Sequence, residues 1–175
     1  MASLRKGKCY TNVTRPYTRK SKVAKRNYIR SVPQSKLVKF DMGNSKKEYT
    51  HKVSLVSKQD IQVRHNALES TRQIVNRHIM QLTGAKPYYM KILSYPHHVL
   101  RENRMLSGAH ADRLQTGMAH SFGSPAGIAA RLKKGKSVIV IFVNANNVES
   151  AKIALKFAYP RMPGKYTVNI EEIKK

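Results

Sequence analysis

The excess of positive charge constrains this chain more than any other feature. It has 34 Lys and Arg residues against 9 Asp and Glu, a formal net charge of +25 at pH 7. Self-repulsion of this size opposes a compact state unless a polyanion neutralises it, and a small soluble domain usually carries a net charge of about 2–8. We find no basic amphipathic helix with an apolar face and no lipidation motif, so the expected polyanion is nucleic acid rather than a membrane.

The length and the cysteine count limit the remaining possibilities. A chain of 175 residues suits a single domain, 1–175, that holds its core without disulfides. The single Cys9 excludes an intramolecular disulfide and a multi-cysteine zinc site, and it is typical of a reducing cytosol. No apolar run approaches the ~20 residues that span a bilayer, and no secretory signal is present. We expect a cytoplasmic protein that forms no homo-oligomer.

Positive charge is concentrated in residues 1–35, which we define as the basic arm. The first acid of the chain is Asp41, and Pro16 and Pro33 interrupt any long helix. Such a segment is expected to be disordered alone and to order on RNA, with cations on phosphates and Tyr rings on sugars or unstacked bases. The alternative is a flexible tail that only speeds association. The candidate RNA contacts of the arm are Arg5, Lys6, Lys8, Arg15, Tyr17, Arg19, Lys20, Lys22, Lys25, Arg26 and Arg30.

Hydrophobic periodicity predicts the secondary structure of the remainder. We expect strands at 35–40, 48–57, 88–95 and 166–172, and a hairpin of 127–132 with 137–143 around the turn at Gly135. The run from Val138 to Val143 is typical of a central strand buried on both faces. Helices are predicted from a capping pair at Ser57 and Asp60 to about Leu82, and over 147–158. The inward stripe of the first helix is Ile61, Leu68, Val75, Ile79 and Leu82.

This order of elements indicates an α+β fold, a mixed or antiparallel sheet with two helices on one face. Further candidate RNA contacts lie outside the arm. They are Arg64, Arg72 and Arg77 on the polar side of the first helix, and His97, His98, Arg101 and Arg104 in "YPHHVLRENRM". Glu102 either orients the neighbouring guanidiniums on phosphates or forms only a local salt bridge with Arg101 or Arg104.

The sequence gives little indication of catalysis. His97 and His98 are adjacent and point in different directions on an extended chain, and the other His residues lack ligands at metal-binding spacing. Cys9 has no base held beside it, and the only paired carboxylates, Glu171 and Glu172, lie at the end of a strand. We therefore expect no catalytic residue, no metal and no cofactor.

Several long motifs, in order along the chain, resemble one family. They are "KCYTNVTRPYTRKS", "YIRSVPQSKLVKFDMGN", "IQVRHNALESTRQIVNRHI", "YPHHVLRENRM" and "GAHADRLQTGMAHSFGSPAGIAAR". The family is the archaeal and eukaryotic large-subunit ribosomal protein ten-e, the counterpart of bacterial large-subunit protein sixteen. The chain ends soon after its last strand, without the C-terminal extension of eukaryotic members, and so resembles the archaeal ones.

The resemblance implies a hammerhead-type α+β fold and a structural role in the large ribosomal subunit. Its implied partners are large-subunit (23S) rRNA, tRNA and neighbouring ribosomal proteins. The implied site on the rRNA is a cleft beneath the tRNA sites.

We expect residues 106–126, which are rich in Gly, Ala and Ser, to form a long internal loop. In the family, the matching part extends towards the tRNA acceptor end near the peptidyl transferase centre, where small, weakly charged residues leave tRNA free to move. Arg113 matches the family pattern, whereas Ala119, His120 and Ser124 stand where many members have cations. The candidate tRNA-proximal residues are Ser107, Gly108, Ala109, His110, Ala111, Asp112, Arg113, Leu114, Gln115, Thr116, Gly117, Met118 and Ala119.

Two other functions are open to a chain of this composition. One is a free-standing RNA- or DNA-compacting or chaperone protein that uses charge without a fixed site. The other is a nucleic-acid-processing enzyme that uses the His97–His98 pair, which the missing acids and metal ligands disfavour.

Overall fold

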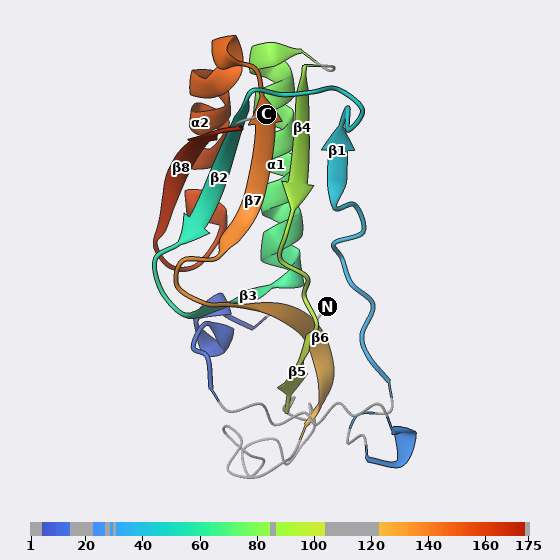
Figure 1. Ribbon diagram of the computed structural model, residues 1–175. Coiled ribbons are helices and arrows are strands. Elements are labelled where there is room, and N and C mark those ends of the chain that lie inside the picture. Colours follow the sequence, from blue (N-terminus) through green and yellow to red (C-terminus); the bar gives the residue numbers. More distant parts are fainter. Residues whose placement is uncertain are drawn as a thin grey trace.

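The computed structural model describes residues 5–14, 23–26, 29, 31–84, 87–103 and 123–173. Its strands are β1 (Asp41–Gly43), β2 (His51–Ser57), β3 (Ile61–Arg64), β4 (Tyr88–Ile92), β5 (His98–Glu102), β6 (Ser124–Leu132), β7 (Ser137–Val143) and β8 (Tyr166–Glu172). Its α-helices are α1 (His65–Thr83) and α2 (Val148–Lys156), and its short 3-10 helices are η1 (Gly7–Tyr10), η2 (Ala24–Arg26), η4 (Ala145–Asn147) and η5 (Tyr159–Arg161). The strands form two antiparallel sheets, ordered β1-β4-β7-β2-β8 and β3-β6-β5 (Figure 1).

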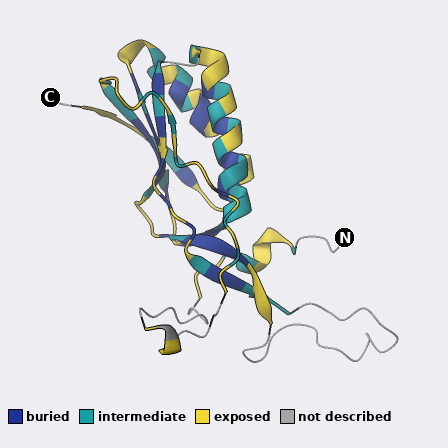
Figure 2. Ribbon diagram, turned by 90° about the vertical axis from the view of Figure 1, so that its right-hand side faces the viewer, coloured by how far each residue is buried: buried dark blue, intermediate teal, exposed yellow. Residues whose placement is uncertain are grey.

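The five-stranded sheet carries both helices on one face, as Figure 2 shows with the sheet seen nearly on edge. The main core lies between this face and the helices. It includes Val53 and Leu55 of β2 and Ile141 of β7, packed with Val75 of α1 and Leu155 of α2, all fully buried. The α+β class with two helices on one face of a sheet is therefore confirmed.

β7 is the central strand of this sheet, between β4 and β2. Its residues Val138 to Ile141 are at most 1% exposed, so side chains on both faces are covered. The apolar run predicted a strand buried on both faces, which is confirmed for Val138–Ile141, whereas Phe142 is only half-buried. The second helix and the strand 166–172 also occur where the sequence placed them, as α2 and β8.

The first helix begins later than the sequence predicted. Residues 61–64 form β3 instead, with Ile61 opposite Leu132 and Val63 opposite Ala130 of β6. Ser57 and Asp60 cap no helix, because the Ser57 hydroxyl donates to the carbonyl of Gln59 (2.7 Å). The alternation of buried Ile61 and Val63 fits a short strand, and pairing with β6 outweighs the helical spacing that these residues share with Leu68.

The predicted hairpin of 127–132 with 137–143 is wrong, although a turn does lie between them. Gly135 has a φ of 82°, as a tight turn requires. The turn leads β6 out of the small sheet and β7 into the large one, so the two strands pair with different partners. The local sequence is typical of a hairpin, but the pairing of each strand with distant strands determines the structure here.

Two smaller expectations also fail. Residues 35–40 lie outside both sheets, because the Ser35 hydroxyl bonds the backbone N–H and C=O of Leu37 and replaces a strand ladder locally. Leu82, expected in the inward stripe of α1, is 49% exposed near the end of the helix, while Thr71 is buried in that stripe. Among the described residues no helix is both long and apolar enough to cross a membrane.

Gly43→Ala and Gly135→Ala form a matched test of packing in β1. Both glycines have positive φ, 87° and 82°, so both substitutions incur backbone strain. A Cβ at Gly43 would also lie 2.2 Å from the carbonyl oxygen of Tyr88, whereas a Cβ at Gly135 meets nothing within 4 Å. We expect Gly43→Ala to lower the free energy of unfolding by about 1–3 kcal/mol more than Gly135→Ala does, measured by urea denaturation. Equal losses would contradict the close approach of β1 to β4.

Candidate nucleic-acid interface

The small sheet is the platform on which part of the basic arm lies. The backbone N–H of Gln62 in β3 donates to the carbonyl of Thr11 (2.9 Å), and its side-chain amide donates to the carbonyl of Tyr10 (2.9 Å). The Tyr10 hydroxyl donates to the carbonyl of Arg101 in β5 (3.2 Å). Arg131 of β6 donates to the carbonyl of Thr14 (2.9 Å). The expectation of a disordered arm is therefore wrong for residues 5–14, which these backbone contacts hold.

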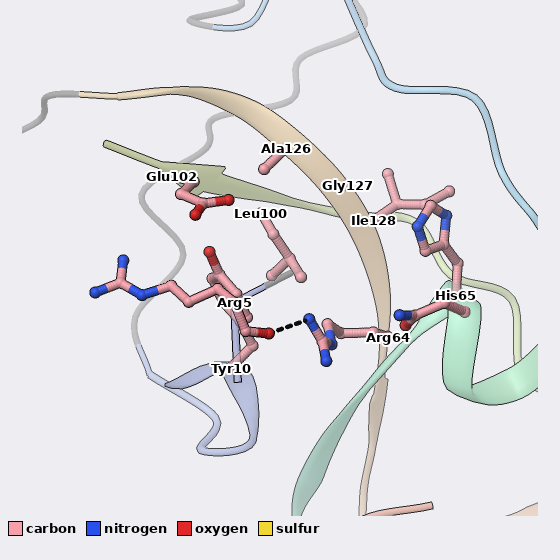
Figure 3. Close-up of a pocket in the computed structure, with 10 residues that line it drawn as sticks. Arg5, Tyr10, Arg64, His65, Leu100, Glu102, Ala126, Gly127 and Ile128 are labelled. Atoms are coloured by element: carbon pink, nitrogen blue, oxygen red, sulfur yellow. Dashed lines mark hydrogen bonds between the residues drawn. The ribbon is translucent and has the colours of Figure 1, made fainter. Parts of the chain in front are cut away.

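Arg64 closes a recess between the arm and the small sheet, shown in Figure 3. Its guanidinium donates to the carbonyl of Arg5 (3.0 Å) and lies 5.7 Å from the centroid of the Tyr10 ring. Burial raises the pKa of Tyr10, and Glu102 adds to the effect, so the hydroxyl remains a donor. Arg64 thus has a structural role in seating the arm, besides the charge that it brings to this end of the molecule.

His65, the first residue of α1, lines the same recess. Burial lowers its pKa, and the positive charges of Lys36 and Arg64 lower it further. The backbone N–H of Lys36 donates to its Nδ1 (3.3 Å), which requires that nitrogen to be unprotonated. His65 is accordingly neutral, and it joins the chain before β1 to the small sheet without adding charge.

A larger groove, of about 550 Å³, lies between the arm, β3 and η5. Its cations are Lys8, Arg64 and Arg161, and no carboxylate is among the residues that line it. Polar groups come from Thr11, Asn12 and Gln62, and one wall is apolar. The apolar residues are Ala67, Pro160, Met162 and Pro163. This arrangement offers donors for phosphate oxygens beside an apolar wall for a base or sugar.

The described candidates differ in their surroundings. Arg5, Arg64 and Arg101 gather at the small sheet, whereas Arg77 is exposed on α1. His98 lies 3.2 Å from Arg131, and His97 is exposed with its Nδ1 3.2 Å from the carbonyl of Tyr95. Lys6, Lys8, Lys25 and Arg26 are exposed in or beside η1 and η2. Outside the described residues are Arg15, Tyr17, Arg19, Lys20, Lys22, Arg30, Arg104 and the loop 107–119.

Arg72 stands apart from the other candidates. Its guanidinium makes a two-pronged contact with Glu69, 2.8 and 2.6 Å, and also lies 3.3 Å from the sulfur of Met42 in β1. The side chains of the pair are only 15% and 19% exposed. Arg72 therefore ties α1 to β1, and its charge is already matched within the fold.

Two arginines at this interface were not among the candidates taken from the sequence. Arg131 interrupts the apolar run of β6 and joins Gln62, His98 and Thr14. Arg161 lies between Pro160 and Met162 in the turn after α2. It is distant from the arm in sequence, and the tertiary fold brings both to the same groove. A cation inside a buried strand was a usable indication for Arg131, whereas nothing local distinguishes Arg161. Across the described ranges, no three His, Cys, Asp or Glu side chains are grouped as a metal site would require.

Comparison with known proteins gives a consistent result. A family model described as "Ribosomal protein L16p/L10e" matches residues 14–169. "Large ribosomal subunit protein uL16" of Staphylothermus marinus is 46% identical over 161 residues, 91% of this chain and 89% of that protein. Proteins of the same name are 47% identical in Methanococcus maripaludis, over 92% of this chain and 90% of the relative, and 45% in Saccharolobus solfataricus, over 95% and 92%.

These matches cover nearly all of the basic α+β fold described above, and they define the chain as a ribosomal protein. More particularly, it belongs to the ribosomal protein L16p/L10e family. The family indicated by the sequence motifs is thus confirmed, as is the similarity to archaeal members.

Glu69→Gln tests the assignment of Arg72 to a structural ion pair. The hydrogen bond from Arg72 holds the pKa of Glu69 below its ordinary value of 4.5, so the pair stabilises the fold above that pH. We expect the variant to lose about 1 kcal/mol of unfolding free energy at pH 7. The difference from the unmodified chain should shrink as the pH falls below 4.5, where Glu69 itself becomes protonated.

Thermal unfolding from pH 3 to pH 7 measures this difference. Glu149→Gln is the control, because Glu149 pairs with Lys152 in the same i,i+3 arrangement but its side chain is 69% exposed. We expect that control to change stability much less. A loss in Glu69→Gln that does not change with pH would show that the charge of the carboxylate does not stabilise the pair.

Proposed function

We propose that this protein is a structural component of the large ribosomal subunit and that it binds large-subunit rRNA through the small sheet, the docked arm and the groove at Arg161. Membership of a ribosomal protein family supports this role, and also the cytoplasmic ribosome as its location. The observation that carries the RNA-binding surface is the groove, which combines three cations with an apolar wall and no lining carboxylate. The protein has no catalytic role in this proposal.

The remaining cations of residues 1–35 extend this surface in the proposal. Residues 5–14 are held by hydrogen bonds to β3, β5 and β6, so the described start of the arm lies at the small sheet. Neutralising many phosphates releases the counterions condensed on the RNA, and this release drives binding. A free-standing compacting protein needs charge but no preformed groove, so the groove favours the ribosomal role.

The proposal assigns the internal loop to tRNA. Strands β5 and β6 are neighbours in the small sheet, with Glu102 opposite Ser124, so the two ends of the connection between them lie side by side. Gly123 makes this possible, because its φ is 104° and a Cβ there would lie 3.0 Å from the carbonyl of Glu102. The segment Ser107–Ala119, with Arg113 as a candidate contact, therefore starts from the RNA-binding end in this proposal and supports tRNA positioning.

Arg161→Ala tests the groove. We expect the unmodified chain to bind large-subunit rRNA with a slope of log K against log[salt] of at least about −5, as many phosphate contacts require. Loss of Arg161 should weaken binding by about tenfold and make the slope shallower by about 1, measured by filter binding. Lys91→Ala is the matched control, because Lys91 lies on the large sheet beside Asp41 (3.9 Å). An equal loss of rRNA affinity in both variants would contradict the proposal that the groove binds rRNA.

Deletion of Ser107–Ala119 tests the division of labour between fold and loop. Residues 103–106 and 120–123 remain to close the connection between the adjacent ends of β5 and β6. We expect the thermal stability and the rRNA affinity to stay nearly unchanged, while tRNA accommodation on reconstituted ribosomes is impaired. Loss of rRNA binding in the deleted chain would contradict the assignment of this segment to tRNA.

A further inference from the structure

The large sheet has a second face that the helices do not cover (Figures 1 and 2). One cross-strand row on this face runs through all five strands, from Gly43 through Tyr89, Phe142 and Lys52 to Glu171. Side chains directly opposite one another share a face, and the alternate row, which includes Val53 and Ile141, points into the helix-covered core. The Tyr89 row therefore faces away from the helices.

An apolar depression of about 420 Å³ lies at this row. Tyr89 and Phe142 stack with ring centroids 5.5 Å apart. The walls come from Tyr49, in the connection that crosses from β1 to β2, and from Ile173, which follows β8 and is 40% exposed. The two rings are half-buried and Ile173 is exposed, so part of their apolar surface remains open here.

The charges around the depression are balanced, unlike those of the whole chain. Among the described residues, the outward positions of these strands and the lining of the depression supply three lysines and three carboxylates: Lys47, Lys52, Lys91, Asp41, Glu48 and Glu171. Lys52 pairs with Glu171 at 2.6 Å, and Asp41 accepts a hydrogen bond from Tyr89 (2.6 Å) that raises the pKa of Tyr89 to about 12. In a chain with 34 cations and 9 acids, a third of the acids gather on this one face.

We propose that this depression is the docking site for an extended, arginine-bearing segment of a neighbouring basic protein of the large subunit. The inference rests on the proposed function, because it requires the chain to be assembled into that subunit. Half-buried aromatic rings at the centre of a patch with a polar rim are typical of a protein–protein interface. RNA gains little here, because Lys52 and Lys91 already lie beside carboxylates of the same face and few counterions would be released.

The exposed carboxylates and the aromatic rings of the depression identify the occupant. Proteins that share a subunit face the same phosphates and are basic for the same physical reason. A guanidinium is attracted to the faces of aromatic rings and forms paired hydrogen bonds with carboxylates. The depression offers both, because the side chains of Asp41 and Glu171 are 55% and 53% exposed beside the Tyr89–Phe142 stack.

Site-specific photo-crosslinking in assembled large subunits tests the inference. A benzophenone amino acid replaces Ile173 in the full chain, the subunits are purified and irradiated, and the crosslinked peptide is sequenced by mass spectrometry. We expect an arginine-containing segment of another subunit protein. Ile153 on α2 is equally exposed, at 40%, and a probe there should not capture the same segment. A second variant, Glu48→Lys, should lower the crosslink yield at 173 by about tenfold by removing a carboxylate from the rim.

Each other outcome overturns the inference. Crosslinks from position 173 to rRNA, no crosslink, or a segment without arginine would contradict it, as would a yield unchanged by Glu48→Lys. Co-sedimentation of each variant with large subunits is measured first. A variant that sediments normally but captures no protein refutes the docking site alone, whereas failure of the unmodified chain to sediment with large subunits refutes the proposed function.

Discussion

The fold depends on two turns that bind each other where the sheets meet. The N–H of Ser57 donates to the carbonyl of Lys136 (3.0 Å), and the N–H of Gly135 donates to the carbonyl of Ser57 (2.8 Å). The N–H of Lys134 donates to the carboxylate of Asp60 (2.7 Å). Two antiparallel segments, β2–β3 and β6–β7, pass together through this junction. On one side of it β2 pairs with β7 in the large sheet, and on the other side β3 pairs with β6 in the small sheet. The junction thus sets where the small sheet, and everything docked on it, lies.

This arrangement separates two kinds of surface in our interpretation. The small sheet presents backbone donors and arginines that hold residues 5–14, and the resulting groove has cations without lining carboxylates. The open face of the large sheet has aromatic rings among matched charges. An RNA phosphate is attracted to the first surface and gains little at the second. One chain can therefore join RNA at one end and protein on one face without either partner competing for the same residues.

The sequence predicted those elements whose pattern is long and regular. The run Val138–Ile141 is long enough to indicate a strand, and the stripe Leu68, Val75 and Ile79 is long enough to indicate a helix; the burial of both is confirmed. The small sheet escaped prediction because β3 and β5 have only 4 and 5 residues. In β3, Ile61 and Val63 suit a strand, yet Ile61 also falls in register with the helix that follows.

The same limit applies to the candidate interface. Cation-rich sequence indicated the arm, but not that backbone carbonyls of Tyr10 and Thr11 seat it on β3. Arg161 reaches the groove only because η5 follows α2 back towards the arm, a proximity that requires the whole topology. The structure pairs Arg72 with Glu69 and directs Arg64 to the arm, although both arginines were candidate RNA contacts.

The use of the few acids explains why the chain is electrostatically incomplete alone. Glu69, Glu149 and Glu171 pair with cations, and Asp60 binds the backbone at the sheet junction. Acids that stabilise the fold in this way cannot also neutralise the cations of the arm and the groove. The positive charges of the arm and the groove therefore remain unmatched by the described protein. A surface built in this way favours folding together with a polyanion, since only the partner supplies the missing negative charge. The net charge of +25 is therefore expected for one component of a complex whose other component is a polyanion.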